Sequence, residues 1–210
     1  MTAVYKFHHA YKPNLDYKYN TVELDCPEGI DFDMWVAQNR GKRLDSRWSL
    51  EFTAEPFRKK KRFGDLLALD SLIVLTNAAK EALDDLLAPN GDYYNVRFDR
   101  IPDVVGFHLT THLDALDYEK TVFHYPGGDK TAKPFDTLEY YFIEEKVVAP
   151  IFTLEKDYGV FVTETFVNRV REKQLLGFGF RKLWDSKLGK LHSEIIPLGG
   201  GPLPEEDENW

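Results

Sequence analysis

The sequence predicts an α+β protein in which a mostly antiparallel or mixed β-sheet carries at least two packed helices. Aromatic and β-branched runs of strand length recur along the 210 residues between proline and glycine turns. Two of these runs lead through a threonine into an amphipathic helical segment. A hydrophobic fraction of 43% and an aromatic fraction of 14% supply enough apolar surface for a packed core.

The first 63 residues predict short strands followed by an irregular basic region. Residues 4–26 alternate in places, as in Val22-Glu23-Leu24, and prolines interrupt them. Basic side chains then gather between Trp35 and Trp48 and in the run 58–62. Such a run can contact nucleic acid or an anionic membrane. In an acidic protein, and without aromatic side chains around it, we interpret it as a solvated loop.

The first strand–helix unit begins with the apolar run 72–75. Thr76 follows, and its hydroxyl is placed to cap a helix over 77–87 that ends at a proline–asparagine–glycine turn. The apolar stripe of this helix consists of Ala79, Ala82, Leu83, Leu86 and Leu87. Asp84 and Asp85 lie near its C-terminus, where the helix dipole disfavours each carboxylate by roughly 0.3–1 kcal/mol. A basic partner is one way to offset that cost, and plain solvent exposure is the other.

The middle of the chain predicts four strands and two turns. The strands are expected over 92–98, 104–113, 138–143 and 147–154, and the turns over 126–129 and 156–159.

The second strand–helix unit repeats the form of the first. The run Phe161-Val162-Thr163 leads into a helix over 164–173, with Gly177 as the expected C-cap residue. Phe166 and Val170 occupy the positions that Ala79 and Leu83 occupy in the first unit. Acid at the start of this helix and base at its end match the helix dipole. Two such units form an internal repeat, which is too few for a solenoid.

The chain divides into three predicted parts. Residues 1–63 form a β-rich or irregular segment packed on the main domain, 64–186 form the α+β domain, and 187–210 form a flexible acidic tail. An alternative for the tail is that Trp210 and the neighbouring acids dock on the basic segment near residue 60.

Charge and composition predict a cytoplasmic protein that binds neither membranes nor nucleic acid. The net charge of −8 is uneven: residues 1–63 hold 12 basic and 9 acidic residues, and the remainder holds 15 and 26. An acidic surface repels nucleic acid and attracts basic proteins, although acid also serves solubility. The N-terminus has no apolar segment of the kind that drives secretion, and no apolar run reaches membrane-spanning length. Cys26 is the single cysteine, which fits a reducing compartment.

No arrangement of residues predicts catalysis, a metal site or a cofactor. His108 and His112 have the spacing of a helical zinc pair, but the flanking residues favour a strand, where they lie about 13 Å apart. His8 and His9 would point to opposite faces of a strand. The sequence lacks a nucleophile elbow, a P-loop and a dinucleotide-binding glycine motif. The carboxylates of Asp114, Asp117 and Glu119 can bind a hard cation, but without a glycine turn we favour solvated or interface acids.

Residues 72–184 resemble the family called immunity protein eleven, whose members accompany polymorphic toxins in bacteria. The resemblance rests on LIVLTNAAKEALDDLL, LDALDYEKT, LEYYFIEE, APIFTLEK and VFVTETFVNRVREKQLLGFGFRKL. The last segment is the most telling because the family's recurring element ends as Leu176–Phe180 does, in leucine-glycine-phenylalanine-x-phenylalanine. The family pattern commonly has serine where this chain has Thr76, Thr121 and Thr163, which keeps the same capping chemistry.

The resemblance implies a non-enzymatic protein that binds a cognate toxin protein and blocks it. An acidic inhibitor suits a basic, nucleic-acid-targeting toxin. We therefore predict that the partner-binding acids are Asp84, Asp85, Asp114, Asp117 and Glu119. The identity of the toxin and the oligomeric state stay open.

Two other functions remain open. One is a hydrolase or small-ligand enzyme, for which His108 or His124 should lie beside a carboxylate in a cleft. The other is an interaction domain that uses exposed tyrosines and tryptophans as anchors.

Overall fold

A computed structural model describes most of the chain. The described residues are 2–12, 16–25, 41–43, 51–58, 62–69, 72–128, 131, 136–155, 157–190 and 208–209. Cys26, most of the basic region 31–61 and the proposed docking of Trp210 lie outside them.

One sheet is built around the N-terminal strand. Its order is β10-β13-β14-β1-β15-β16, with β17 on the outer edge of β15. The strands are β1 (Ala3–His9), β10 (His112–Leu113), β13 (Ile151–Leu154), β14 (Asp157–Thr163), β15 (Phe178–Asp185), β16 (Gly189–Lys190) and β17 (Glu208–Asn209). β1 is an inner strand, antiparallel to both β14 and β15. The division of the chain at residue 63 stays a prediction, but its first strand is part of the main sheet.

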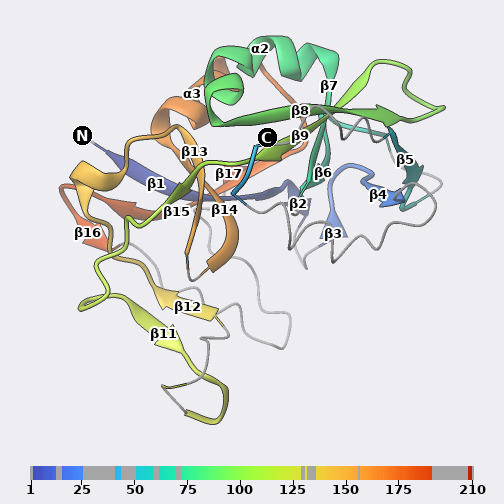
Figure 1. The fold of residues 1–210 in the computed structure, drawn as a ribbon. Coiled ribbons are helices and arrows are strands. Elements are labelled where there is room, and N and C mark those ends of the chain that lie inside the picture. The colour runs from blue at the N-terminus through green and yellow to red at the C-terminus, as the bar shows by residue number, and fades with distance from the viewer. Residues whose placement is uncertain are drawn as a thin grey trace.

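A second sheet has the order β4-β5-β8-β9-β7-β6. Its strands are β4 (Val22–Asp25), β5 (Glu51–Pro56), β6 (Leu66–Leu69), β7 (Ile73–Thr76), β8 (Gly91–Arg97) and β9 (Val104–Leu109). β5 and β8 are parallel and the other pairs are antiparallel. Two small hairpins, β2 (Tyr11–Lys12) with β3 (Asp16–Tyr17) and β11 (Val122–His124) with β12 (Asp136–Glu139), complete the strands of the described ranges. The hairpin of β11 and β12 stands away from the main body (Figure 1).

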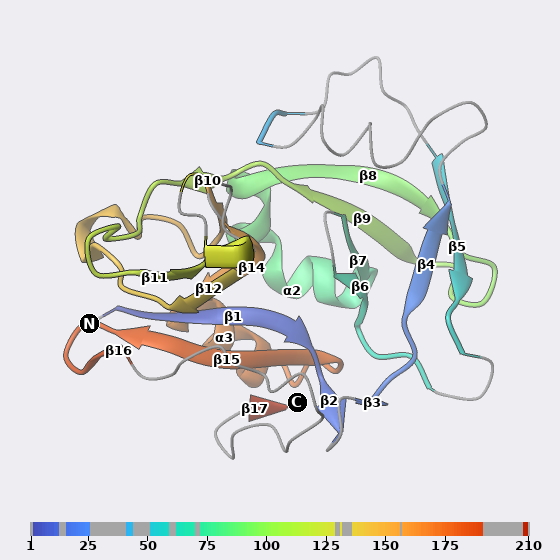
Figure 2. The same cartoon turned by 90° about the horizontal axis from the view of Figure 1, so that it is seen from below.

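The α-helices of the described residues, α2 (Asn77–Leu87) and α3 (Glu164–Glu172), lie side by side on the same side of the molecule (Figure 1). The largest core cluster joins both helices to both sheets. It includes Phe7 and Phe180 from the first sheet, Phe107 from the second, and Leu83 and Phe166 from the helices. Figure 2, seen from below, shows α2 behind the strands of the two sheets, and Figure 1 shows it above them. The predicted α+β class, with mixed or antiparallel sheets and two packed helices, is confirmed.

Both predicted helices are present, and their ends differ from the prediction in one place. α2 spans the predicted residues, and the Thr76 hydroxyl accepts from the Ala79 amide at 3.3 Å. α3 does not end at Gly177. It ends at Glu172, one residue before the predicted limit, and its C-cap Lys173 is followed by Gln174 with a φ of +54°. Gln174 and Leu175 donate to the carbonyls of Arg171 and Val170, the bonding pattern of a Schellman motif.

Gly177 serves a different purpose from the one predicted. Its φ of +94° lies in the region that favours glycine, and a Cβ there would lie 3.2 Å from the Leu66 carbonyl oxygen. The Leu66 amide also donates to the carbonyl of Leu176. Gly177 therefore lets the loop after α3 approach β6.

Several predicted strand limits were wrong because long-range bonds end the strands. The predicted strand 104–113 divides into β9 and β10, since Thr110 and Thr111 donate their amides to the Asn90 carbonyl. The predicted strand 138–143 continues only to Glu139, and the strand predicted over 147–154 begins at Ile151 after a 3-10 turn, η3 (Glu144–Lys146). The predicted turn 156–159 is largely strand, because β14 begins at Asp157.

Within the described ranges, no helix is long and apolar enough to cross a membrane.

Candidate functional site

Asp84 and Asp85, two of the predicted partner-binding acids, lie on the last turn of α2 and both have partners within the chain. Asp84 accepts from Tyr93 at 3.0 Å and pairs with Lys80 at 3.0 Å. Asp85 accepts two bonds from the guanidinium of Arg169 on α3, at 2.6 and 3.1 Å. These contacts lower the pKa of both carboxyls, Lys80 being the largest cause for Asp84 and Arg169 for Asp85. The unfavourable helix-end charge is therefore offset within the chain.

The other three predicted acids lie between β10 and β11. Asp114 pairs with Lys146 at 3.2 Å, which lowers its pKa. Asp117 pairs with Lys120 at 2.7 Å and accepts the amides of Glu119 and Lys120, so it organises its own turn. The Lys120 bond likewise lowers the pKa of Asp117. Glu119 is exposed, and across the described ranges it forms no ion pair.

The two groups of acids are separate, and one segment lies between them. Lys146 contacts Asp114, and from the next residue the segment 147–150 lines the same groove as Asp85. Four of the five carboxylates are compensated by a neighbouring cation, so their local field is weaker than the formal charges suggest. The sequence could identify the acids, but two of their four cationic partners, Lys146 and Arg169, are distant along the chain and required the fold.

A groove of about 600 Å³ lies between the C-terminal end of α2, the segment 147–150 and the N-terminal end of α3. Its lining is Thr2, Ala3, Asp85, Leu86, Pro89, Asn90, Val147, Val148, Ala149, Pro150, Thr163, Glu164, Thr165 and Asn168. Two of these side chains are acidic and none is basic. Val148 is 76% exposed. We call this the α2–α3 groove.

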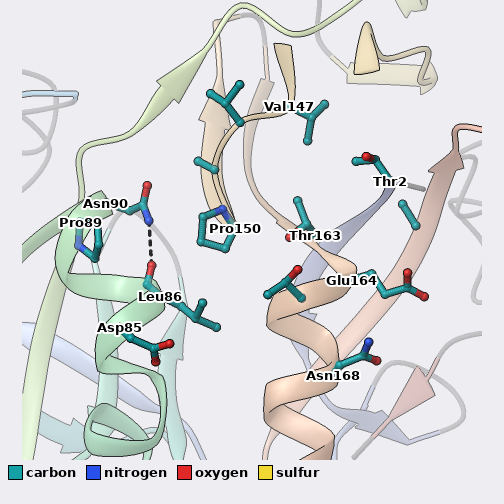
Figure 3. A pocket seen from close by; sticks show the side chains of 14 residues that line it. Thr2, Asp85, Leu86, Pro89, Asn90, Val147, Pro150, Thr163, Glu164 and Asn168 are labelled. Atoms are coloured by element: carbon teal, nitrogen blue, oxygen red, sulfur yellow. Dashed lines mark hydrogen bonds between the residues drawn. The ribbon is translucent and has the colours of Figure 1, made fainter. Parts of the chain in front are cut away.

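Figure 3 shows how the two helices border the α2–α3 groove. Asp85 and Leu86 project from α2 toward α3, and Pro150 lies between the helices. Glu164 lies on the other side of α3, nearer Thr2. The Asn90 side chain donates to the Leu86 carbonyl at 2.7 Å and thereby closes the end of α2. The groove thus has an apolar centre with one carboxylate on the α2 side and another on the Thr2 side.

The two histidines named for an enzyme, His108 and His124, are register partners of Asp92 and Asp136 on neighbouring strands, and neither lines the α2–α3 groove. His108 is buried, and its Nε2 lies 3.2 Å from the Lys42 carbonyl oxygen. His112 is exposed, with its Nδ1 3.0 Å from the Thr153 hydroxyl, and His124 is exposed on β11. Of the residues that the structure describes, no group of three or more histidines, cysteines and carboxylates is placed to hold a metal ion.

A second cavity, of about 210 Å³, was not foreseen. It is lined by Phe7, His8, His9, Tyr11, Tyr17, Leu69, Gly159 and Val160. Burial, with a smaller contribution from His8, lowers the pKa of His9 to about 4, so this imidazole is neutral at pH 7. The rings of His8 and Tyr11 stack at 5.1 Å, and those of Tyr11 and Tyr17 at 5.3 Å. The described lining of this cavity has two histidines and no carboxylate.

Comparison with known proteins identifies one family. A family model described as "Immunity protein family (Imm11)" matches residues 17–185, most of the chain. No curated protein matches the sequence.

Proposed function

The chain belongs to the Imm11 immunity protein family, and on this premise we propose that it binds a cognate toxin protein and neutralises it by stoichiometric inhibition. In this proposal the protein has no catalytic role and needs no cofactor. The family match carries the proposal, since membership of an immunity family implies a toxin as the partner.

We propose further that the toxin is basic and acts on nucleic acid. The net charge of −8 gives the molecule a long-range field that accelerates its association with a basic protein. Ion pairing within the chain reduces the local field around Asp84, Asp85, Asp114 and Asp117, but their carboxylates retain lone pairs for further donors. Glu119 is exposed, and the side chains of Asp85 and Asp114, 61% and 58% exposed, are more accessible than those of Asp84 and Asp117.

Co-expression tests the proposed inhibition. In this proposal the neighbouring gene encodes the toxin as a secreted protein, and the C-terminal domain of that protein is the probe. Expressed alone, this domain should arrest growth, and co-expression of the immunity protein should restore it. The purified proteins should form a 1:1 complex. Growth arrest that persists at a molar excess of folded immunity protein would refute the proposal.

Charge neutralisation tests the five predicted acids separately from the function itself. A variant with Asn at Asp84, Asp85, Asp114 and Asp117 and Gln at Glu119 should bind the toxin domain with a slower association rate. Its rate should also depend less on salt, because rim charges act mainly on association. A variant neutralised at Glu23 and Glu55, on the paired strands β4 and β5, serves as the control. If the five-site variant kept the rate and salt dependence of the native protein, these acids would not form the contact surface.

A further inference from the structure

We propose that the α2–α3 groove receives a segment of the toxin in which an apolar side chain is flanked by lysine or arginine. This assignment rests on the proposed function and goes beyond it by naming the contact surface and the chemistry of the segment that fills it. None of the five acids predicted from the sequence except Asp85 belongs to this groove.

The apolar centre of the groove supports the first part of the assignment. Val148 is 76% exposed, more than any other large apolar side chain in the described ranges. Its neighbours Val147, Ala149 and Pro150 line the groove as well, together with Leu86 and Pro89 from α2 and the turn that follows it. An exposed valine next to a concave apolar surface gains from burial against a partner, because apolar area is removed from water.

The charges of the groove support the second part. Asp85 and Glu164 are the only ionisable side chains among its described lining residues. Glu164 forms no ion pair within the described ranges, and its charge, after burial, contributes to the raised pKa of Tyr5. Asp85 is bound to Arg169 but is still 61% exposed, so its oxygens can accept a further donor. A cationic side chain entering the groove would therefore meet the carboxylate of Glu164, which no cation of the described ranges pairs, and that of Asp85, which it would share with Arg169.

The walls of the groove are held in place before any partner binds. Arg169 bonds to both carboxylate oxygens of Asp85 and to the Ala82 carbonyl, which fixes α3 against α2. The Thr163 amide donates to the Pro150 carbonyl at 3.0 Å and fixes the segment 147–150 at the start of α3. A preformed surface loses little conformational freedom on binding, and this favours affinity.

The shape of the groove favours a protein segment over a small ligand. Its volume falls within the range of small-molecule pockets, but such pockets enclose most of the ligand surface. Val148, three-quarters exposed, leaves the mouth open to a larger partner. Groups in the groove recognise a cation beside an apolar group, and a toxin that is basic overall would present such a segment.

Binding of three single variants to the toxin domain of the neighbouring gene, measured by calorimetry at two salt concentrations, tests the assignment. Val148→Asp should weaken binding at least about 10-fold, because it places a charge in the apolar centre of the interface. Glu164→Gln should weaken binding about 2- to 5-fold and lower its salt dependence. Leu188→Asp is the matched control, since Leu188 is 72% exposed in the turn between β15 and β16, and its affinity should stay within about 2-fold of native. Thermal unfolding of each variant should match the native protein.

The possible outcomes distinguish the proposed contact at the groove from the proposed toxin-binding function. If the native protein binds the toxin domain and Val148→Asp and Glu164→Gln bind it equally well, the groove is not the contact surface, while the proposed function stands. Native protein that does not bind the domain overturns both. A native dimer in solution that Val148→Asp dissociates would assign the groove to a second copy of this chain and would also overturn the inference.

Discussion

The two strand–helix units of this protein have similar sequences but are held at their ends in different ways. In both, an apolar strand passes through a threonine into an amphipathic helix that contributes to the same core. In the first unit the Thr76 hydroxyl caps the helix and donates to Asp65 at 2.8 Å. In the second unit the Thr163 side chain makes no capping bond. The same residue therefore caps or does not cap according to its tertiary neighbours.

The C-terminal ends differ in the same way. α3 carries Arg169 and Arg171 in its last turn, where the helix dipole favours cations, whereas α2 carries acids and no base there. The acids of α2 are stabilised from outside their helix, Asp85 by Arg169 of α3 and Asp84 in part by Tyr93. Because the first unit depends on contacts that the second supplies, the pair forms one rigid border of the α2–α3 groove.

Removing the aromatic side chain that distinguishes the second unit should have the largest effect. Phe166 is buried and its ring lies 5.7 Å from that of Phe7, whereas the equivalent position of α2 is already Ala79. Phe166→Ala should cost about 3–5 kcal/mol of unfolding free energy through lost burial and a cavity. Urea unfolding measures this cost. A loss below about 1 kcal/mol would mean that α3 does not pack as described.

Acidic pH should lower the free energy of unfolding through His9, which lines a cavity next to the second unit with Gly159 and Val160 of β14. The pKa of His9 falls from 6.5 to about 4 on folding, so the unfolded chain binds more protons below pH 6.5. The contribution of His9 is complete above pH 6.5 and is lost as the pH falls toward 4. Between pH 7 and 5 the loss should be about 2 kcal/mol. In urea unfolding His9→Asn should remove this difference between the two pH values, and an unchanged difference would assign it to other groups.

Replacing each of the two threonines by alanine should destabilise the protein more in the unit whose threonine caps its helix. Thr76→Ala should cost about 1 kcal/mol or somewhat more, since it removes the bond to the Ala79 amide and the bond to Asp65. Thr163→Ala should cost less than about 0.5 kcal/mol because no capping bond is lost. Equal costs in thermal unfolding would remove the distinction drawn between the two N-termini.

Glycine at the helix ends should have opposite, smaller effects in the two units. Gln174 adopts a φ of +54°, so Gln174→Gly should stabilise the protein by about 1 kcal/mol. Ala88, at the end of α2, has a right-handed conformation with a φ of −54°, and Ala88→Gly should destabilise by about 0.5–1 kcal/mol. Changes of the same sign in a chemical unfolding series would contradict the assigned backbone conformations.

The sequence correctly predicted features that are determined by residues close to one another in the chain. The limits of α2 follow from the Thr76 cap, a 3.6-residue apolar stripe and a proline turn, all of which lie within fifteen residues. The C-cap predicted for α3 was wrong because glycine is the usual residue at a positive φ, and here Gln174 adopts that conformation instead. A pattern search for glycine alone could not find it.

Long-range bonds explain the remaining errors. The break between β9 and β10 depends on Asn90, whose carbonyl accepts the amides of Thr110 and Thr111 and whose side chain accepts the Thr111 hydroxyl. The α2–α3 groove likewise combines Asp85, Val148 and Glu164 from three distant segments. The acids could be identified from charge and exposure patterns. Their pairing with Arg169 and Lys146, and the proximity of Val148, required the fold.

Hydrogen exchange in the complex with the toxin domain tests most directly whether toxin binds at the α2–α3 groove. The proposal predicts slower exchange at the amides of 147–149 and 164–168 when the toxin domain is bound, with residues 51–58 unchanged. Protection confined to residues 51–58, with the groove amides exchanging as they do in the free protein, would contradict it.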